Sequence, residues 1–110
     1  MIVIKPGASI KNCREDILRA LISVDPIYGK HGVNTIVTSG SEVYKHSADR
    51  SGHYRGDAVD LRIKNIVKDL RKALVRVIKR KLGSDFVVFW ERMGTPYEHV
   101  HIHWSPRFKG

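Results

Sequence analysis

Hydrophobic residues recur at helical spacing in two parts of this 110-residue chain. We expect the first helix to begin at Asn12, which can cap it while Glu15 completes a capping box, and to end by Gly29. The second helix is predicted over residues 66–82, where Gly83 supplies the stop. The two apolar stripes consist of Ile17, Leu18, Leu21 and Ile22, and of Ile66, Val67, Leu70, Leu74, Val77, Ile78 and Leu82.

Four shorter segments have the length and pattern of β-strands, either β-branched, nearly all apolar, or alternating between apolar and polar side chains. They are residues 35–38, 58–63, 85–90 and 97–104. A turn over residues 92–96 joins the last two into a hairpin. The order of the elements predicts an α+β domain, in which two main helices pack on a small, mainly antiparallel sheet.

The length and composition predict one soluble domain over residues 1–110 and exclude several classes of protein. Cys13 is the only cysteine, so the chain has neither an intramolecular disulfide nor a cysteine-rich zinc finger. No apolar run approaches the ~20 residues of a membrane span, and residues 1–6 do not resemble a secretory signal. We expect a monomer that is made in the cytoplasm and reaches any external target by lysis or delivery by a particle.

The net charge of +9 predicts an anionic partner. Nucleic acid, a membrane surface and an acidic polymer such as a bacterial cell wall all meet this requirement. The charge alone does not choose among them.

Candidate metal ligands lie in two parts of the sequence. His53 belongs to a long polar loop over residues 41–57, and Asp60 lies on the strand that follows. Three further imidazoles alternate along the last strand and therefore share one of its faces. These are His99, His101 and His103. Three protein ligands and one open position are typical of a hydrolytic zinc site, so we expect one Zn²⁺ on the sheet, held by His53, Asp60 and one of the three.

The motif Ser51-x-His53-x-x-Gly56-x-Ala58-x-Asp60, followed by Glu98-x-x-His101, resembles the zinc D-Ala-D-Ala carboxypeptidase family. That family includes D-Ala-D-Ala dipeptidases and phage L-alanyl-D-glutamate endopeptidases. Thr38-Ser39-Gly40 and the terminal His-x-His-x-x-Trp are similar to short phage-type members, and the resemblance covers residues 35–106. It implies a peptidase that hydrolyses peptidoglycan stem peptides in cell-wall degradation, as a carboxypeptidase or an endopeptidase, in a phage or other lytic context.

The resemblance also implies a role for each matching residue. Glu98 would be the general base, and His99 a donor to the transition state. On an unbroken strand Glu98 would face away from the histidines, so it reaches the metal only if the strand begins after it. The implied zinc ligands are His53, Asp60 and His101, with His103 as the second candidate for the third position.

Substrate binding departs from the family pattern. Many members carry an arginine soon after the Ser-Gly turn to bind a substrate carboxylate, whereas Ser41-Glu42 follows here. Ser51 would help to hold the substrate, and Arg62 is a weaker candidate to pair with a carboxylate near the site. Candidates to replace the missing arginine are Lys45, His46 and Arg50. The sequence leaves open which stem-peptide bond is cut.

Two other hypotheses remain. The charge also fits a basic nucleic-acid-binding module or a His-metal nuclease, but the chain has no RNA-type aromatic pair on a strand and no clear helix-turn-helix. We therefore expect no nucleic-acid partner. A catalytically idle relative that only binds zinc or cell wall is the other hypothesis. In the favoured hypothesis, that of a peptidase, the cationic loop over residues 45–55 and the helix over residues 66–82 concentrate the enzyme on anionic wall polymers.

Overall fold

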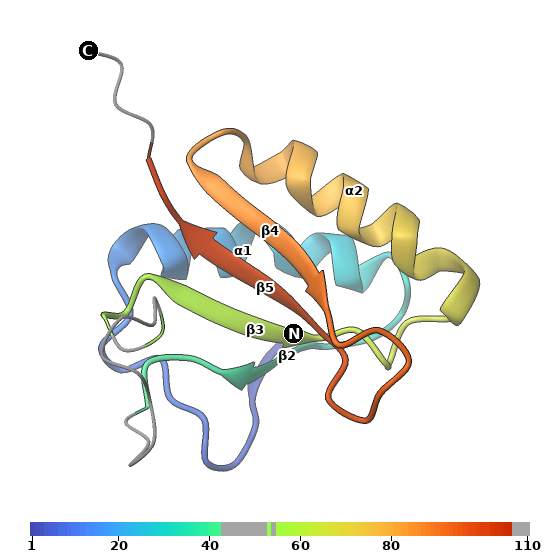
Figure 1. Ribbon diagram of the computed structural model, residues 1–110, viewed down its shortest axis with the longest axis horizontal. Coiled ribbons are helices and arrows are strands. Elements are labelled where there is room, and N and C mark those ends of the chain that lie inside the picture. Colours follow the sequence, from blue (N-terminus) through green and yellow to red (C-terminus); the bar gives the residue numbers. More distant parts are fainter. Residues whose placement is uncertain (43–52, 54, 107–110) are drawn as a thin grey trace.

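The computed structural model describes residues 1–42, 53 and 55–106, which form one five-stranded sheet and two α-helices (Figure 1). The predicted α+β class is confirmed. The strands are β1 Ile2–Ile4, β2 Thr35–Ser39, β3 Ala58–Arg62, β4 Phe86–Glu91 and β5 His99–Trp104. The helices are α1 Glu15–Gly29 and α2 Arg71–Leu82, the latter preceded by a 3₁₀ turn over Lys68–Leu70.

The sheet has the strand order β1-β2-β3-β5-β4 and is antiparallel except at one edge. β1 pairs in parallel with β2 and was not predicted, because three apolar residues followed closely by Pro6 carry little strand signal. The other neighbours pair antiparallel, and β4 and β5 form the predicted hairpin. β3 and β5 therefore lie inside the sheet, with hydrogen-bonded partners on both sides.

Both helices pack on the same face of the sheet, and Figure 1 shows α1 behind the strands and α2 next to β4. The core between the layers is apolar and comes from both helices and from alternate positions of the inner strands. Its fully buried members include Ile17, Val24, Tyr28, Val59, Leu61, Ile78, Val100 and Ile102. The residues between these positions on the inner strands point to the opposite face, which no helix of the described chain covers.

Both helices begin at a different residue than predicted. α1 begins at Glu15 with Arg14 as its N-cap, and no side chain caps it, so the predicted Asn12 capping box is wrong. The backbone N–H of Asn12 instead donates to Ser41 Oγ at 3.0 Å. α2 begins at Arg71, five residues later than predicted, because the preceding residues form a bend and a 3₁₀ turn. Gly83 ends it with φ +77°, as expected.

Among the described residues, no helix is both long enough and apolar enough to cross a membrane. Helix α1 has 15 residues and α2 has 12, and each has a polar face.

Tyr28 links α1 to the end of β3 and gives a test of the fold. Its fully buried hydroxyl donates to the carbonyl of Arg62 at 2.7 Å. Tyr28→Phe leaves that carbonyl without its donor, so we expect it to lower the free energy of unfolding by about 1–2 kcal/mol at neutral pH, measured by urea titration.

The same substitution predicts a pH dependence. Burial raises the pKa of Tyr28 in the folded state, whereas the unfolded side chain has its usual pKa near ~10. The contribution of Tyr28 to the free energy of unfolding of wild type is therefore fully present below pH ~10. It is lost as pH rises further, by about 1.4 kcal/mol per pH unit. The Tyr28→Phe variant has no hydroxyl to ionise and does not lose stability in this way. The difference in free energy of unfolding between wild type and the variant should therefore shrink at high pH. A difference that stays constant above pH ~10 would contradict the argument.

Candidate metal centre

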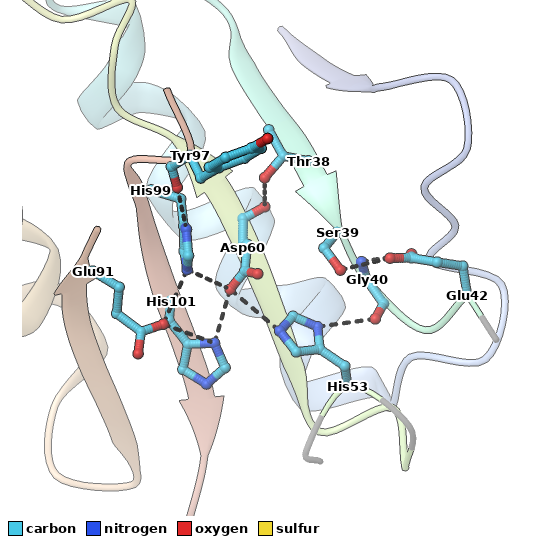
Figure 2. A network of polar contacts seen from close by, with 10 residues as sticks. All are labelled: Thr38, Ser39, Gly40, Glu42, His53, Asp60, Glu91, Tyr97, His99 and His101. Carbon is cyan, nitrogen blue, oxygen red and sulfur yellow. Dashed lines mark hydrogen bonds and ion pairs between the residues drawn. The ribbon is translucent and has the colours of Figure 1, made fainter. Parts of the chain in front are cut away.

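The open face of the sheet carries a cluster of carboxylate and imidazole groups, contributed by three adjacent strands and one loop (Figure 2). Asp60 on β3 lies directly opposite His101 on β5. On the other side of β5, Glu91 of β4 lies opposite His99. Because side chains alternate along a strand, His99 and His101 share this face while Val100 and Ile102 are fully buried in the core.

One carboxylate oxygen of Asp60 is the centre of the cluster. Its Oδ1 lies 2.8 Å from His101 Nδ1, 3.2 Å from His53 Nε2 and 3.5 Å from His99 Nε2. Ligand atoms that bind a tetrahedral ion at ~2.0–2.1 Å are about 3.3–3.4 Å from one another. The observed separations from Asp60 lie close to this value, so these side chains fit a small divalent ion.

His53 reaches the cluster because the loop turns sharply after it. The N–H of Gly56 donates to the carbonyl of His53 at 3.0 Å, and Gly56 has φ +76°. A Cβ at Gly56 would lie 2.1 Å from the carbonyl oxygen of Asn12, so only glycine fits this contact. The His53 ring is oriented by Gly40, whose carbonyl accepts from Nδ1 at 3.0 Å. That bond leaves Nε2 directed at Asp60 with its lone pair available for a metal.

Glu91 belongs to the cluster although the sequence analysis did not select it. Its Oε1 lies 3.0 Å from His99 Nε2 and 3.9 Å from His101 Nδ1. One ligand atom from each of Asp60, Glu91, His99 and His101 lies within 4.8 Å of all the others. The register of the hairpin brings it there, because the last residue of β4 lies opposite the first residue of β5.

Glu98, the predicted base, lies outside the cluster, and its catalytic role stays a prediction. β5 does begin after it, as that role required, but its carboxylate is buried on the helix side. It accepts hydrogen bonds from Trp90 Nε1 at 2.7 Å, from Arg71 Nη1 at 3.2 Å and from the N–H of Gly94 at 3.3 Å. These bonds hold both oxygens, so Glu98 joins the hairpin turn to α2.

The electrostatics of the cluster favour a charged Asp60. Burial raises the pKa of its carboxyl, but hydrogen bonds and positive charge from the histidines outweigh burial and lower it to about 2. For His53, burial lowers the pKa, and the hydrogen bond and charge of Asp60 outweigh it and raise the pKa. The side chains of Asp60, His53, His99 and His101 are only 15–19% exposed. The cluster therefore combines partial burial with one firm negative charge, which suits a cation.

His103 lies on the same strand face but one step farther along β5. Its ring centre is 5.7 Å from that of His101, and its partner on β3 is Ala58 instead of Asp60. Burial first, and then the charge of His101, lower the pKa of His103. This position makes His103 a neighbour of the cluster, whereas His101 faces Asp60 directly.

The predicted substrate-binding residues do not all fall within the described structure. Ser51, Lys45, His46 and Arg50 lie outside the described residues. Glu42, which stands where many members of the resembling family have an arginine, accepts from the N–H groups of Ser9 at 2.9 Å and Gly40 at 2.7 Å. It also accepts from the hydroxyl of Ser39. Its carboxylate thus fixes the Ser-Gly turn that orients His53.

No protein-family model matches the chain, and no curated protein matches it. The resemblance to the D-Ala-D-Ala carboxypeptidase family therefore stays a prediction from the motifs. The structure itself establishes that the chain brings together a group of Asp, Glu and His side chains that could hold a metal ion.

Asp60→Asn tests the centre of this group. The substitution removes the negative charge but keeps the size of the side chain, so we expect Zn²⁺ affinity to fall by about 100-fold or more. Isothermal titration with Zn²⁺ measures the change. His103→Asn is the matched control on the same sheet face and should bind almost as tightly as wild type. Equal affinities for wild type and Asp60→Asn would place any bound metal elsewhere.

Proposed function

We propose that this chain is a zinc-dependent peptidase that hydrolyses stem peptides of bacterial peptidoglycan. The observation that carries the proposal is the convergence of His53, His99 and His101 on one oxygen of Asp60, on a sheet face that no described helix covers. The resemblance of the surrounding motifs to the zinc carboxypeptidase family supplies the substrate class.

His53, Asp60 and His101 are the residues that would hold one zinc ion. Two imidazoles and one carboxylate are a ligand set that catalytic zinc sites use, and the separations around Asp60 fit it. When bound, zinc supplies a Lewis acid and acidifies a water molecule to a pKa near ~7. The carbonyl of Gly40 keeps the His53 ring in the tautomer that such a site needs.

Glu91 is the general base in this proposal, in place of Glu98. Its Oε1 is beside the His99 and His101 nitrogens, and its side chain is 46% exposed, so water and substrate have access to it. It would take a proton from the attacking water onto a carboxylate oxygen and pass it to the nitrogen of the leaving amine. Glu98 is 6% exposed and fully engaged by its three donors, which leaves it no such path.

His99 is placed to donate to the developing oxyanion. The carbonyl of Tyr97 can only accept, so the contact of 2.8 Å to Nδ1 puts a hydrogen on that nitrogen. The other nitrogen, Nε2, faces the carboxylates of Glu91 and Asp60 at 3.0 and 3.5 Å. In this proposal the N–H of Nε2 is the group that donates to the negative oxygen of the transition state, where such a donor stabilises the developing charge.

The positive charge of the chain supports an anionic polymer as partner. Arg76, Lys79, Arg80 and Lys81 are exposed on α2, away from the cluster, and would hold the enzyme on anionic wall polymers after release from the cell that makes it. The same charge favours the alternative, a His-metal nuclease that uses the same cluster on nucleic acid. A relative that binds zinc or wall without catalysis is the third case.

One experiment separates these cases. Purified peptidoglycan and duplex DNA are incubated with the protein, with zinc or with a chelator, and the products are identified by mass spectrometry and gel electrophoresis. The proposal expects zinc-dependent release of stem-peptide fragments and intact DNA, and the fragment masses identify the bond. Zinc-dependent cleavage of DNA alone would support the nuclease, and no cleavage of either polymer would support the idle relative.

Glu91→Gln tests the assignment of the base. The amide keeps the shape of the side chain but cannot take a proton, so hydrolysis of the stem peptide should slow by about 10²–10⁴-fold while Zn²⁺ affinity is retained. A variant that loses zinc along with activity would make Glu91 a metal ligand. A variant as active as wild type would remove it from the mechanism.

Glu98→Gln is the matched substitution on the buried side of the hairpin. It weakens charge-assisted hydrogen bonds to Arg71 and Trp90, so we expect the free energy of unfolding to fall by about 1–3 kcal/mol. The hydrolysis rate per folded molecule should stay close to that of wild type. The opposite result, full stability with lost activity, would restore the role first predicted for Glu98.

A further inference from the structure

A groove of about 900 Å³ opens beside His99, on the side of the cluster away from His53. It lies between the end of β3, the turn of the β4–β5 hairpin and the segment after β1. Its lining consists of Lys5, Thr38, Arg62, Lys64, Asn65, Arg92, Pro96, Tyr97, Glu98 and His99. Figure 2 shows Tyr97 and Thr38 next to His99, where the groove meets the cluster.

The lining of the groove is strongly cationic. Four of its side chains carry a positive charge, Lys5, Arg62, Lys64 and Arg92, and its one carboxylate, Glu98, is already paired with Arg71. Within the described part of the chain, Lys5, Arg62 and Arg92 have no acidic partner, and Lys64 contacts only the carbonyl of Pro96 at 3.4 Å. Unpaired positive charges gathered in one concave surface favour an anionic ligand.

Arg62 ties the groove to the metal cluster. It is the direct partner of His99 across β3 and β5, so their Cβ atoms are neighbours on the open face, about 4.5–5.5 Å apart. It also shares that face with Asp60, two residues earlier on the same strand. The backbone of Arg62 is held in place by Tyr28, whose hydroxyl donates to its carbonyl. A fixed backbone next to the cluster positions its guanidinium for a ligand that reaches both.

Arg92 adds a cation from the hairpin turn in an unusual backbone conformation. It is the only residue other than glycine with a positive φ in the described structure, at +58°. Thr95 holds this conformation, because its N–H and its hydroxyl both donate to the carbonyl of Arg92, at 3.1 and 2.7 Å. The left-handed conformation is unfavourable for a residue with a side chain. Strain of this kind gathers at functional sites.

We propose that this groove binds a carboxylate of the substrate peptide, with Arg62 as the principal contact. The inference rests on the proposed peptidase function and deepens it by naming an acidic peptide as the substrate class. A guanidinium holds a carboxylate with two parallel hydrogen bonds, and the surrounding lysines add charge without fixed geometry. Glu42 fixes the Ser-Gly turn, and the groove offers a cation for the substrate on the opposite side of the cluster.

Two kinds of carboxylate share this chemistry: the α-carboxylate at the end of a peptide and the side-chain carboxylate of a glutamate. Binding is measured in the Glu91→Gln background, which suppresses turnover, by fluorescence anisotropy of labelled peptides. One pair of probes ends in D-Ala-D-Ala with a free or an amidated terminus. The other contains L-Ala-D-Glu with a free or an amidated side chain. Tighter binding of the free peptide than of its amidated partner in the first pair indicates a carboxypeptidase. The same result in the second pair indicates an endopeptidase.

Arg62→Gln should weaken binding of the preferred free peptide by about 10-fold or more and leave its amidated partner unaffected. Arg62→Lys should recover part of the loss, since it restores the charge without the paired geometry. Arg80→Gln is the matched control, because it removes the same charge from the exposed face of α2. Lys64→Gln is a second groove variant at an exposed position, to be used if Arg62→Gln does not fold. It should also weaken binding of the preferred free peptide.

The outcomes separate this inference from the proposed function. Equal binding of free and amidated peptides, or an equal loss in Arg62→Gln and Arg80→Gln, overturns the groove assignment even when wild type hydrolyses peptidoglycan. Carboxylate-dependent binding that Arg62→Gln abolishes supports the groove even when wild type hydrolyses nothing, and that result overturns only the peptidase.

Discussion

The pairing of β3 with β5 in one register places the centre of the candidate site. In this register Asp60 faces His101, and the residues between them on each strand enter the core. Burial of Val100 and Ile102 enforces it, because a slip of one residue would turn these side chains to water and the imidazoles into the core. The burial of apolar side chains that stabilises the fold therefore also places the histidines on the open face.

This arrangement has an electrostatic cost that the cluster itself offsets. Partial burial disfavours the charge of Asp60, yet its pKa falls to about 2 because imidazole groups surround it. Hydrogen bonds outside the cluster hold two of those rings, because His53 Nδ1 donates to the carbonyl of Gly40 and His99 Nδ1 donates to that of Tyr97. Since the His53 and His99 rings are held by the backbone and all three rings lie beside Asp60, the cluster is preorganised and a cation would require little rearrangement.

The parts of the fold that depend on local pattern could be predicted from the sequence, and those that depend on distant contacts could not. The apolar stripe and the alternation of side chains were sufficient to predict that α2 and β5 exist, but not the residue at which each begins. β1 exists because β2 offers it a parallel edge, which three residues do not reveal. The start of α1 is set by the bond of 3.0 Å from the N–H of Arg14 to the carbonyl of Gly56, a partner forty-two residues away.

The two glutamates of the hairpin show where motif spacing fails for the site. Spacing selected Glu98, three residues before His101, but its side chain meets the donors of Trp90 and Arg71 before it could reach the open face. Glu91 has no motif spacing to recommend it, and only the register of the hairpin puts it beside His99. A general base must exchange protons with water and substrate, so its carboxylate must lie within their reach. By that criterion the buried Glu98 is suited to stabilise the turn, and the half-exposed Glu91 is the better candidate for the base that we propose.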